Sequence, residues 1–142
     1  MLDILPGINS TTAALNAERI RMDVVGQNIA NLNTTHGSDG RPYQRQQVVF
    51  ETLLRAARDG IGTEPQGITV ARIEKDHRAP RLIYEPGHPD ADASGMVAVP
   101  DINMAEEMVD LIAASRAFEA NLAVVKNARS MAIQTLAIGK RS

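Results

Sequence analysis

Two groups of ionisable residues stand close enough together in this sequence to suggest chemistry. His88, Asp90 and Asp92 form an H-x-D-x-D string, and alternate side chains of an extended segment can converge on a divalent cation. Glu106 and Glu107 are neighbouring carboxylates, and general acid–base catalysis uses carboxylates in pairs. The string has neither the glycine-bearing loop of an EF-hand nor a second cluster of ligands, so it fits a solvated acidic turn better than a metal site.

The two glutamates are better explained by the start of a helix than by catalysis. Adjacent helical positions point about 100° apart, so Glu106 and Glu107 cannot work as a pair from one helix. Asn103 has the spacing of a capping box with Glu106, and acidic side chains favour the positive end of the helix dipole. The chain has no cysteine, which excludes a disulfide, a thiolate metal site and a thiol nucleophile. We therefore expect no enzyme activity, no cofactor and no metal.

The helix that follows carries an apolar row with a period of seven residues. The row consists of Met104, Leu111, Phe118, Val125 and Ala132, and Met108, Leu122 and Leu136 stand four residues after three of its members. A helix from Met104 to Ile138 is about 50 Å long at 1.5 Å per residue, which is more than a domain of this size covers by itself. Gly139 is placed for a left-handed C-terminal cap, and Lys140 and Arg141 follow it. This helix needs a partner.

The N-terminal segment provides a suitable partner. Its apolar residues recur at the same interval, namely Ile8, Leu15, Met22 and Ile29, with Val25 and Leu32 beside them. A repeat held over several heptads implies supercoiling around another helix, so we expect the terminal helices to form a coiled-coil-like antiparallel pair. Pro6 is compatible only with the first turn, and a cluster of turn formers from Asn33 to Pro42 ends the helix.

The segment between the helices predicts a small, irregular β subdomain with short strands. We expect strands at 43–50, 68–73, 82–84 and 96–99, and we interpret residues 52–58 as a helical turn or a loop. The expected fold is mainly α with a small β subdomain, an α+β architecture. It divides into an N-terminal helix at 1–35, a β and loop subdomain at 36–100, and a C-terminal helix at 101–142.

Composition narrows the functions that such a fold can serve. A net charge of −2 with scattered Lys and Arg lacks the basic face that nucleic acids require. The first residues, which include Asp3 and Pro6, do not form a cleavable signal peptide, and no segment approaches a membrane span. With two tyrosines, two phenylalanines and no tryptophan, burial must come from aliphatic side chains spread along the helices.

Several polar and small residues have two interpretations each. Asn28, Asn31 and Asn33 act either as caps at the end of the first helix or as hydrogen-bonding groups between subunits. Arg129 stands in a row position, either as a buried cation that fixes register or at an exposed edge. A set of alanines beside the main row either forms a second face for further helices or reflects helix propensity alone. These alanines are Ala113, Ala114, Ala117, Ala120 and Ala123.

Four segments of the chain resemble the bacterial flagellar axial proteins, which comprise rod, hook and hook-associated subunits. Residues 28–34, N-I-A-N-L-N-T, are similar to the N-I-A-N-x-x-T signature of that superfamily. Residues 107–121 are similar to its E-M-V-x…S-R-A-[YF]-x-A-N segment. The D-G-R-P-Y run at 39–43 and the Y-E-P-G run at 84–87 extend the resemblance to the proximal-rod subunits over essentially the whole chain.

The resemblance implies a structural subunit of the flagellar basal body. Such a subunit assembles helically into the proximal rod, which transmits torque from the motor to the hook and encloses the export channel. The implied partners are further copies of the chain, other proximal and distal rod proteins, and the base of the rod at the junction of the MS-ring and the export gate. Neither nucleic acid nor direct membrane insertion is expected. The implied location is a rod that spans the periplasm, reached by type III export without a cleavable signal peptide.

The residues that we expect to pack between subunits lie on both helices. They are Leu15, Met22, Val25, Asn28, Ile29, Asn31, Leu32, Met104, Met108, Leu111, Ser115, Arg116, Phe118, Asn121, Leu122 and Val125. The alternatives are another rod subunit of the same family, a cytoplasmic helical-hairpin adaptor or export chaperone, and an enzyme. Stoichiometric amounts of the chain in purified hook-basal bodies would exclude the adaptor and the enzyme.

Overall fold

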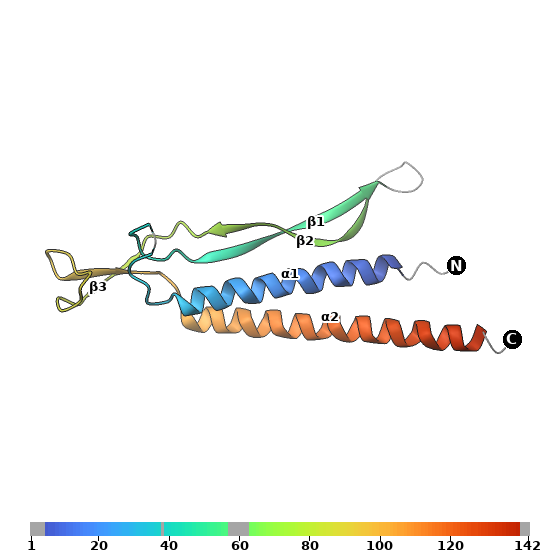
Figure 1. Cartoon of the computed structure of the whole chain (residues 1–142). Helices are drawn as coiled ribbons and strands as arrows, with labels where there is room; N and C mark the ends of the chain where they lie inside the picture. Colours follow the sequence, from blue (N-terminus) through green and yellow to red (C-terminus); the bar gives the residue numbers. More distant parts are fainter. Residues whose placement is uncertain (1–4, 38, 57–62, 140–142) are drawn as a thin grey trace.

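The computed structural model describes residues 5–37, 39–56 and 63–139, which form an elongated molecule of two helices and two β-hairpins (Figure 1). The elements are α1 (Leu5–Ala30), β1 (Gln46–Ala56), β2 (Thr63–Lys75), β3 (Arg81–Tyr84), β4 (Met96–Val99) and α2 (Met104–Gly139). This arrangement confirms the expected fold, mainly α with a small β part between the terminal helices. Neither described helix is at once long enough and apolar enough to cross a membrane.

The helices α1 and α2 lie side by side in antiparallel orientation, as the sequence predicts (Figure 1). Val24 and Val25 of α1 and Ala114 of α2 are buried between the elements of this core. An ion pair of 3.2 Å joins Arg21 to Asp110 across the two helices. Pro6 lies in the first turn of α1, where its missing N–H costs no helical hydrogen bond.

The apolar row of α2 is confirmed only in part. Leu111, Phe118, Val125 and Ala132 are partly buried, and so is Leu122, one of the three members expected four residues on. The stripe also includes Glu107, Ala114, Asn121 and Ala128, which were not expected in it. Met104, Met108 and Leu136 are exposed. The distance between two helix axes depends on the side chains at the contact, and α1 approaches α2 over the smaller residues. The bulkier side of α2 is left open.

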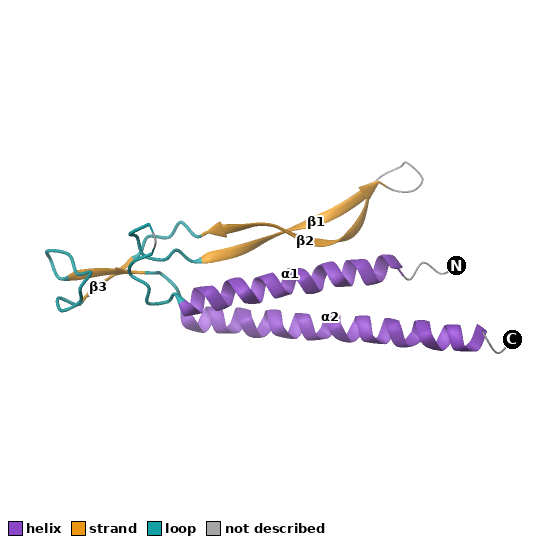
Figure 2. Ribbon diagram, in the orientation of Figure 1, coloured by secondary structure: helices purple, strands orange, loops and turns teal. Residues whose placement is uncertain are grey.

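The first hairpin corrects two expectations. Its strands have 11 and 13 residues and are therefore not short, and they follow α1 along much of its length (Figure 2). Residues 52–56 belong to β1, so the predicted helical turn or loop is wrong there, and residues 57–58 lie outside the described part of the chain. The strand predicted from residue 43 begins only at Gln46.

Two bulges in β2 explain why the alternation along this strand is imperfect in the sequence. Opposite β1, the register skips one residue of β2 after Val70 and another after Pro65. Each skip restores the alternation, so Ile68, Val70 and Ile73 stand on one face although their spacing changes from two residues to three. The hairpin lies close to α1 at Gly67, where a Cβ atom would lie 3.3 Å from Cα of Ser10.

The second hairpin and the ends of α2 were mostly predictable. Strands β3 and β4 pair antiparallel at the expected positions. At the start of α2, Oδ1 of Asn103 accepts a hydrogen bond of 3.0 Å from the N–H of Ala105, which confirms the cap. Glu106 accepts a bond from the side-chain amide of Asn103 instead of from its backbone N–H. Gly139 is part of the helix and lacks the left-handed conformation that we expected.

Candidate structural site: a buried polar junction

The last turn of α1 places a fully buried asparagine against the start of β1. The side-chain amide of Asn28 donates to the carbonyl of Gln46 at 2.8 Å and to Oε2 of Glu107 at 2.9 Å. Its oxygen accepts from the N–H of Gln46 at 2.9 Å and from the hydroxyl of Tyr43 at 3.0 Å. These four bonds use the full capacity of an asparagine side chain. Asn28 therefore joins α1 to β1 and to α2.

The geometry at Gln46 resembles the pairing of strands. In a β-strand the N–H and C=O of one residue point to the same side, and a neighbouring strand binds both. Asn28 binds both groups of Gln46, so its side chain takes the place of a strand at the edge of β1 that faces away from β2. The amide of Asn28 thus fixes where the hairpin begins relative to the end of α1.

The charge at the junction is carried by Glu107, which is fully buried in the first turn of α2. Its Oε1 accepts a hydrogen bond of 2.6 Å from Nε of Arg45, whose side chain is 17% exposed. Arg45 also lies 3.8 Å from Asp110, which pairs in turn with Arg21. A buried carboxylate is tolerated only when it is paired and hydrogen-bonded, and both carboxylate oxygens of Glu107 have partners.

Tyr43 completes the junction from the segment that leads into β1. Burial is the main cause that raises the pKa of the Tyr43 phenol, and the negative charge of Glu107 raises it further. The phenol therefore keeps its proton and can donate to Asn28.

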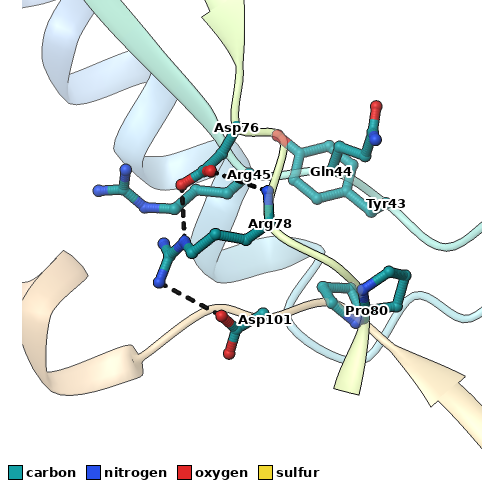
Figure 3. Close-up of a pocket in the computed structure, with 8 residues that line it drawn as sticks. Tyr43, Gln44, Arg45, Asp76, Arg78, Pro80 and Asp101 are labelled. Carbon is teal, nitrogen blue, oxygen red and sulfur yellow. Dashed lines mark hydrogen bonds and ion pairs between the residues drawn. The ribbon is translucent and has the colours of Figure 1, made fainter. Parts of the chain in front are cut away.

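A second network of ion pairs lies beside Arg45, around a small pocket (Figure 3). Nε of Arg78 contacts Asp76 at 2.8 Å, and another nitrogen of Arg78 lies 3.3 Å from Asp101. Burial tends to raise the pKa of Asp76, but hydrogen bonds from Arg78 and the charges of Arg78 and Arg45 lower it below its usual value. This network of ion pairs connects the end of β2 to the segment that precedes α2.

The H-x-D-x-D string has a structural role in the described molecule. Oδ2 of Asp90 accepts a hydrogen bond of 2.6 Å from the hydroxyl of Thr35, and Oδ1 lies 3.5 Å from Nδ1 of His36. Asp92 accepts from the backbone N–H of Met96 at 2.9 Å. The string therefore ties the turn after α1 to the loop between β3 and β4. Within the described residues, no group of three or more His, Cys, Asp or Glu could hold a metal ion.

The residues that we expect to pack between subunits fall into three groups by exposure. Met104, Met108 and Arg116 are exposed, and Val25 and Asn28 are buried inside the chain. Partial exposure is shared by Leu15, Met22, Ile29, Asn31, Leu32, Leu111, Ser115, Phe118, Asn121, Leu122 and Val125. Each of these partly exposed side chains leaves some surface that a neighbouring subunit could contact.

The open alternatives separate once the contacts are known. Asn31 is a cap, because its amide donates to the carbonyl of Gln27 at 2.8 Å and its oxygen accepts from Thr34. The cap interpretation is wrong for Asn28, which contacts β1 and α2. Arg129 lies at an exposed edge. Of the alanines, Ala114 is buried and Ala117 partly buried, whereas the others face outwards, namely Ala113, Ala120 and Ala123.

Sequence reasoning missed the roles of Glu107, Arg45 and Tyr43. One signal was present for Glu107, which stands seven residues before Ala114 and fourteen before Asn121, on the stripe that turned out to be buried. Tyr43 closes the D-G-R-P-Y run at 39–43, but neither that run nor the local sequence around Arg45 reveals a contact with Asn28 or Glu107, because those partners are distant along the chain.

Two family models match the chain, one towards each end. Residues 8–37 match the family model described as flagella basal body rod protein, and residues 93–138 match the flagellar basal body rod FlgEFG protein C-terminal model. These two segments contain Asn28 and Glu107.

Similar proteins extend the match to nearly the full length. The chain is 40% identical to the flagellar basal-body rod protein FlgC of Borreliella burgdorferi, over 96% of this chain and 98% of that protein. It is 35% identical to FlgC of Bacillus subtilis, over 94% and 96%, and 38% identical to FlgC of Salmonella typhimurium, over 90% and 92%. On this likeness over almost the whole of both partners, the chain belongs to the family of the flagellar basal-body rod protein FlgC.

Proposed function

We propose that this chain, a structural subunit of the flagellar basal-body rod, assembles helically with its neighbours through one side of α2. This outward side of α2 carries the exposed residues Val109, Ile112 and Val124. The array forms the proximal rod, encloses the export channel and transmits torque from the motor to the hook. Family membership supports the rod assignment. The helical arrangement rests on the surface chemistry of α2.

The observation that carries the proposal is the contrast between the outward sides of the two helices. On α2, Val109, Ile112 and Val124 are 66%, 52% and 54% exposed, with exposed alanines between them. On α1, no large apolar side chain is exposed among the described side chains, and most exposed positions are polar, as in Asn16 and Arg19. A long apolar side on one helix of a pair marks an interaction surface, because soluble monomers rarely expose contiguous apolar patches. Neighbouring rod subunits would cover this side.

The residues that we assign to subunit packing have direct and indirect roles. The exposed Met104, Met108 and Arg116 contact neighbours directly. Partly exposed residues such as Leu122 contact both their own chain and a neighbouring subunit. Asn28 and Val25 act indirectly, because they fix the helix pair that presents the surface.

The junction suits a part that carries torque. We assign residues 1–35 and 101–142 to the helical core of the rod and 36–100 to an outer β and loop subdomain. Asn28, Arg45 and Glu107 come one from each of these parts and bond to one another through Glu107. Load on the outer part can therefore pass to both helices without a flexible hinge between them.

Location and partners follow from the same assignment. The rod spans the periplasm, and the chain reaches it through the type III export apparatus without a cleavable signal peptide. Its partners are copies of itself, other proximal and distal rod proteins, and the base of the rod at the junction of the MS-ring and the export gate. Its role is structural and not catalytic, in keeping with the names of its relatives.

Substitution of Val124 tests the proposal. Val124→Glu places a charge in the middle of the outward side of α2, where the side chain is already exposed, so the monomer keeps its helix content. Cells that carry Val124→Glu should lose swimming, and the chain should be missing from purified hook-basal bodies. Val124→Leu is the matched control and should retain both. Motile Val124→Glu cells with normal amounts of the chain in the basal body would contradict the proposal.

A further inference from the structure

One carboxylate oxygen of α1 is buried without a hydrogen-bond donor. Oε2 of Glu18 has no hydrogen-bond partner, although the side chain as a whole is 20% exposed. Among the described side chains, it is the only buried nitrogen or oxygen atom that lacks a partner. A buried acceptor without a donor costs free energy, and a charged acceptor costs more than a neutral one. A donor for this oxygen would therefore stabilise the chain.

A guanidinium group lies just out of hydrogen-bonding reach of this oxygen. One terminal nitrogen of Arg21 is 3.8 Å from Oε2 of Glu18, which is an ion pair but not a hydrogen bond. The other terminal nitrogen of Arg21 donates a hydrogen bond of 3.2 Å to Oδ1 of Asp110. Glu18 stands one turn before Arg21 on α1, whereas Asp110 belongs to α2. The two carboxylates therefore compete for one cation.

The two carboxylates differ in what they gain from Arg21. The side chain of Asp110 is 40% exposed and has a second cation beside it, because a nitrogen of Arg45 lies 3.8 Å away. Water and Arg45 compensate the charge of Asp110 when Arg21 leaves, and an exposed ion pair contributes little stability. Glu18 gains a donor for its buried oxygen. The loss at Asp110 and the gain at Glu18 are of the same order, so the two positions of Arg21 are close in free energy.

We propose that Arg21 is a latch with two positions, one on Asp110 that ties α1 to α2 and one on Glu18 that releases this tie. The structure shows the first position. In the second position Arg21 bonds within its own helix, and Arg45 remains the cation beside Asp110. The hydrogen bonds of Glu107 use other atoms and persist in both positions. The latch thus loosens the helix contact beyond the buried junction and leaves the junction itself intact.

The surroundings of Arg21 permit this movement. Arg21 lines a cleft of about 270 Å³ between α1, β1 and α2, together with Val24, Phe50 and Asp110. Its side chain is 31% exposed, and exposed side chains change rotamer without a change in the backbone. The latch opens when Asp110 loses its charge or takes another cation. It is a property of the single chain and goes beyond the proposed function, so the purified chain tests it.

A double-mutant cycle between Glu18 and Arg21 measures the latch in the purified full-length chain. Urea denaturation of Glu18→Gln, Arg21→Gln and the double variant gives the coupling, first in the native chain and then in Asp110→Asn. In the native chain the coupling should change the equilibrium constant of unfolding by less than about twofold, as for an exposed ion pair. In Asp110→Asn the coupling should rise to about tenfold, because Arg21 then donates to the buried oxygen.

Asp23→Asn is the matched control for Asp110→Asn. Asp23 is exposed on α1, and the carboxylates that pair with Arg21 are Glu18 and Asp110. Its substitution removes the same charge but frees no arginine, so the coupling between Glu18 and Arg21 should stay below about twofold. A crystal structure of Asp110→Asn gives a readout that does not depend on stability. A nitrogen of Arg21 should then lie within about 3.2 Å of Oε2 of Glu18.

The latch is wrong if the coupling between Glu18 and Arg21 is the same with and without Asp110→Asn, or if it rises equally in Asp23→Asn. It is also wrong if Arg21 stays away from Glu18 in the structure of Asp110→Asn, which would leave water as the donor to the buried oxygen. That structure decides the question even where Arg21→Gln does not fold. None of these results bears on rod assembly, which Val124→Glu tests separately.

Discussion

Glu107 and Glu106 are neighbours in the sequence with opposite surroundings. Glu107 is fully buried and bonded to Arg45 and Asn28, whereas Glu106 is exposed and contacts Asn103 at the surface. Removal of one partner from a buried charge pair leaves the other charge without compensation, and this costs far more than the pair contributes as a whole. The two residues therefore form a natural matched pair for experiment.

Glu107→Gln should lower the free energy of unfolding by about 2 to 3 kcal/mol. The glutamine keeps the shape of the side chain but removes the charge that faces Arg45. Glu106→Gln, the control, should change the free energy by less than about 0.5 kcal/mol, as surface substitutions usually do. Urea denaturation followed by circular dichroism measures both. Equal effects of the two variants would show that the junction does not stabilise the fold.

Tyr43 gives the junction a dependence on pH. The pKa of its phenol is raised in the folded chain, so the folded state holds the proton more tightly than the unfolded state does. The contribution of Tyr43 to the free energy of unfolding is fully present below the ordinary pKa of 10.0. It is lost as the pH rises through the higher pKa of the folded chain. The native chain should therefore lose stability above about pH 10 more steeply than Tyr43→Phe. Parallel denaturation curves of the two proteins across that range would contradict this.

Single residues were the least predictable level of this molecule. The cap at Asn103 and the cap at Asn31 depend on groups within four residues, and local spacing reveals them. Asn28 and Glu107 are 79 positions apart, and their bond exists only because the two helices pack in one particular register. No local rule reports that register.

At the scale of elements, periodicity predicted the helices well and the first hairpin poorly. The seven-residue spacing located α1 and α2 and their pairing, because an apolar stripe on a helix has a fixed period. It did not decide on which side of Leu111 and Phe118 the partner would lie, since both sides offer an alternating spacing of three and four. The hairpin was underestimated because the bulges after Pro65 and Val70 break the simple alternation of a strand.

Two glycines test the local account of these elements. Gly26 lies within α1, and a Cβ atom added there would meet nothing within 4 Å, so Gly26→Ala should raise the free energy of unfolding by about 1 kcal/mol. Gly67 has a φ of +138° and almost touches Ser10, so Gly67→Ala should lower it by more than about 1 kcal/mol. Thermal denaturation of both variants gives the comparison. A destabilising Gly26→Ala would mean that another chain or segment lies against that turn.

At the scale of the whole molecule, the structure is an elongated pair of helices with two β-hairpins, and apolar residues of α2 remain exposed. The fold class and the family followed from the sequence, because the helical repeats and the motifs at 28–34 and 107–121 are local patterns. The sequence did not show which side of α2 packs against α1. The outward side of α2 could therefore be recognised as exposed surface only from the structure. A chain that buries one side of a 36-residue helix and exposes apolar residues on another is built to be completed by neighbours.

The most direct test of this account is an electron cryo-microscopy map of the intact basal body, resolved to side chains. The account predicts that Val109, Ile112 and Val124 are covered by neighbouring rod subunits, while Asn28 and Glu107 remain bonded within one chain. A map in which this side of α2 faces solvent along the rod, with no neighbouring subunit in contact, would contradict it.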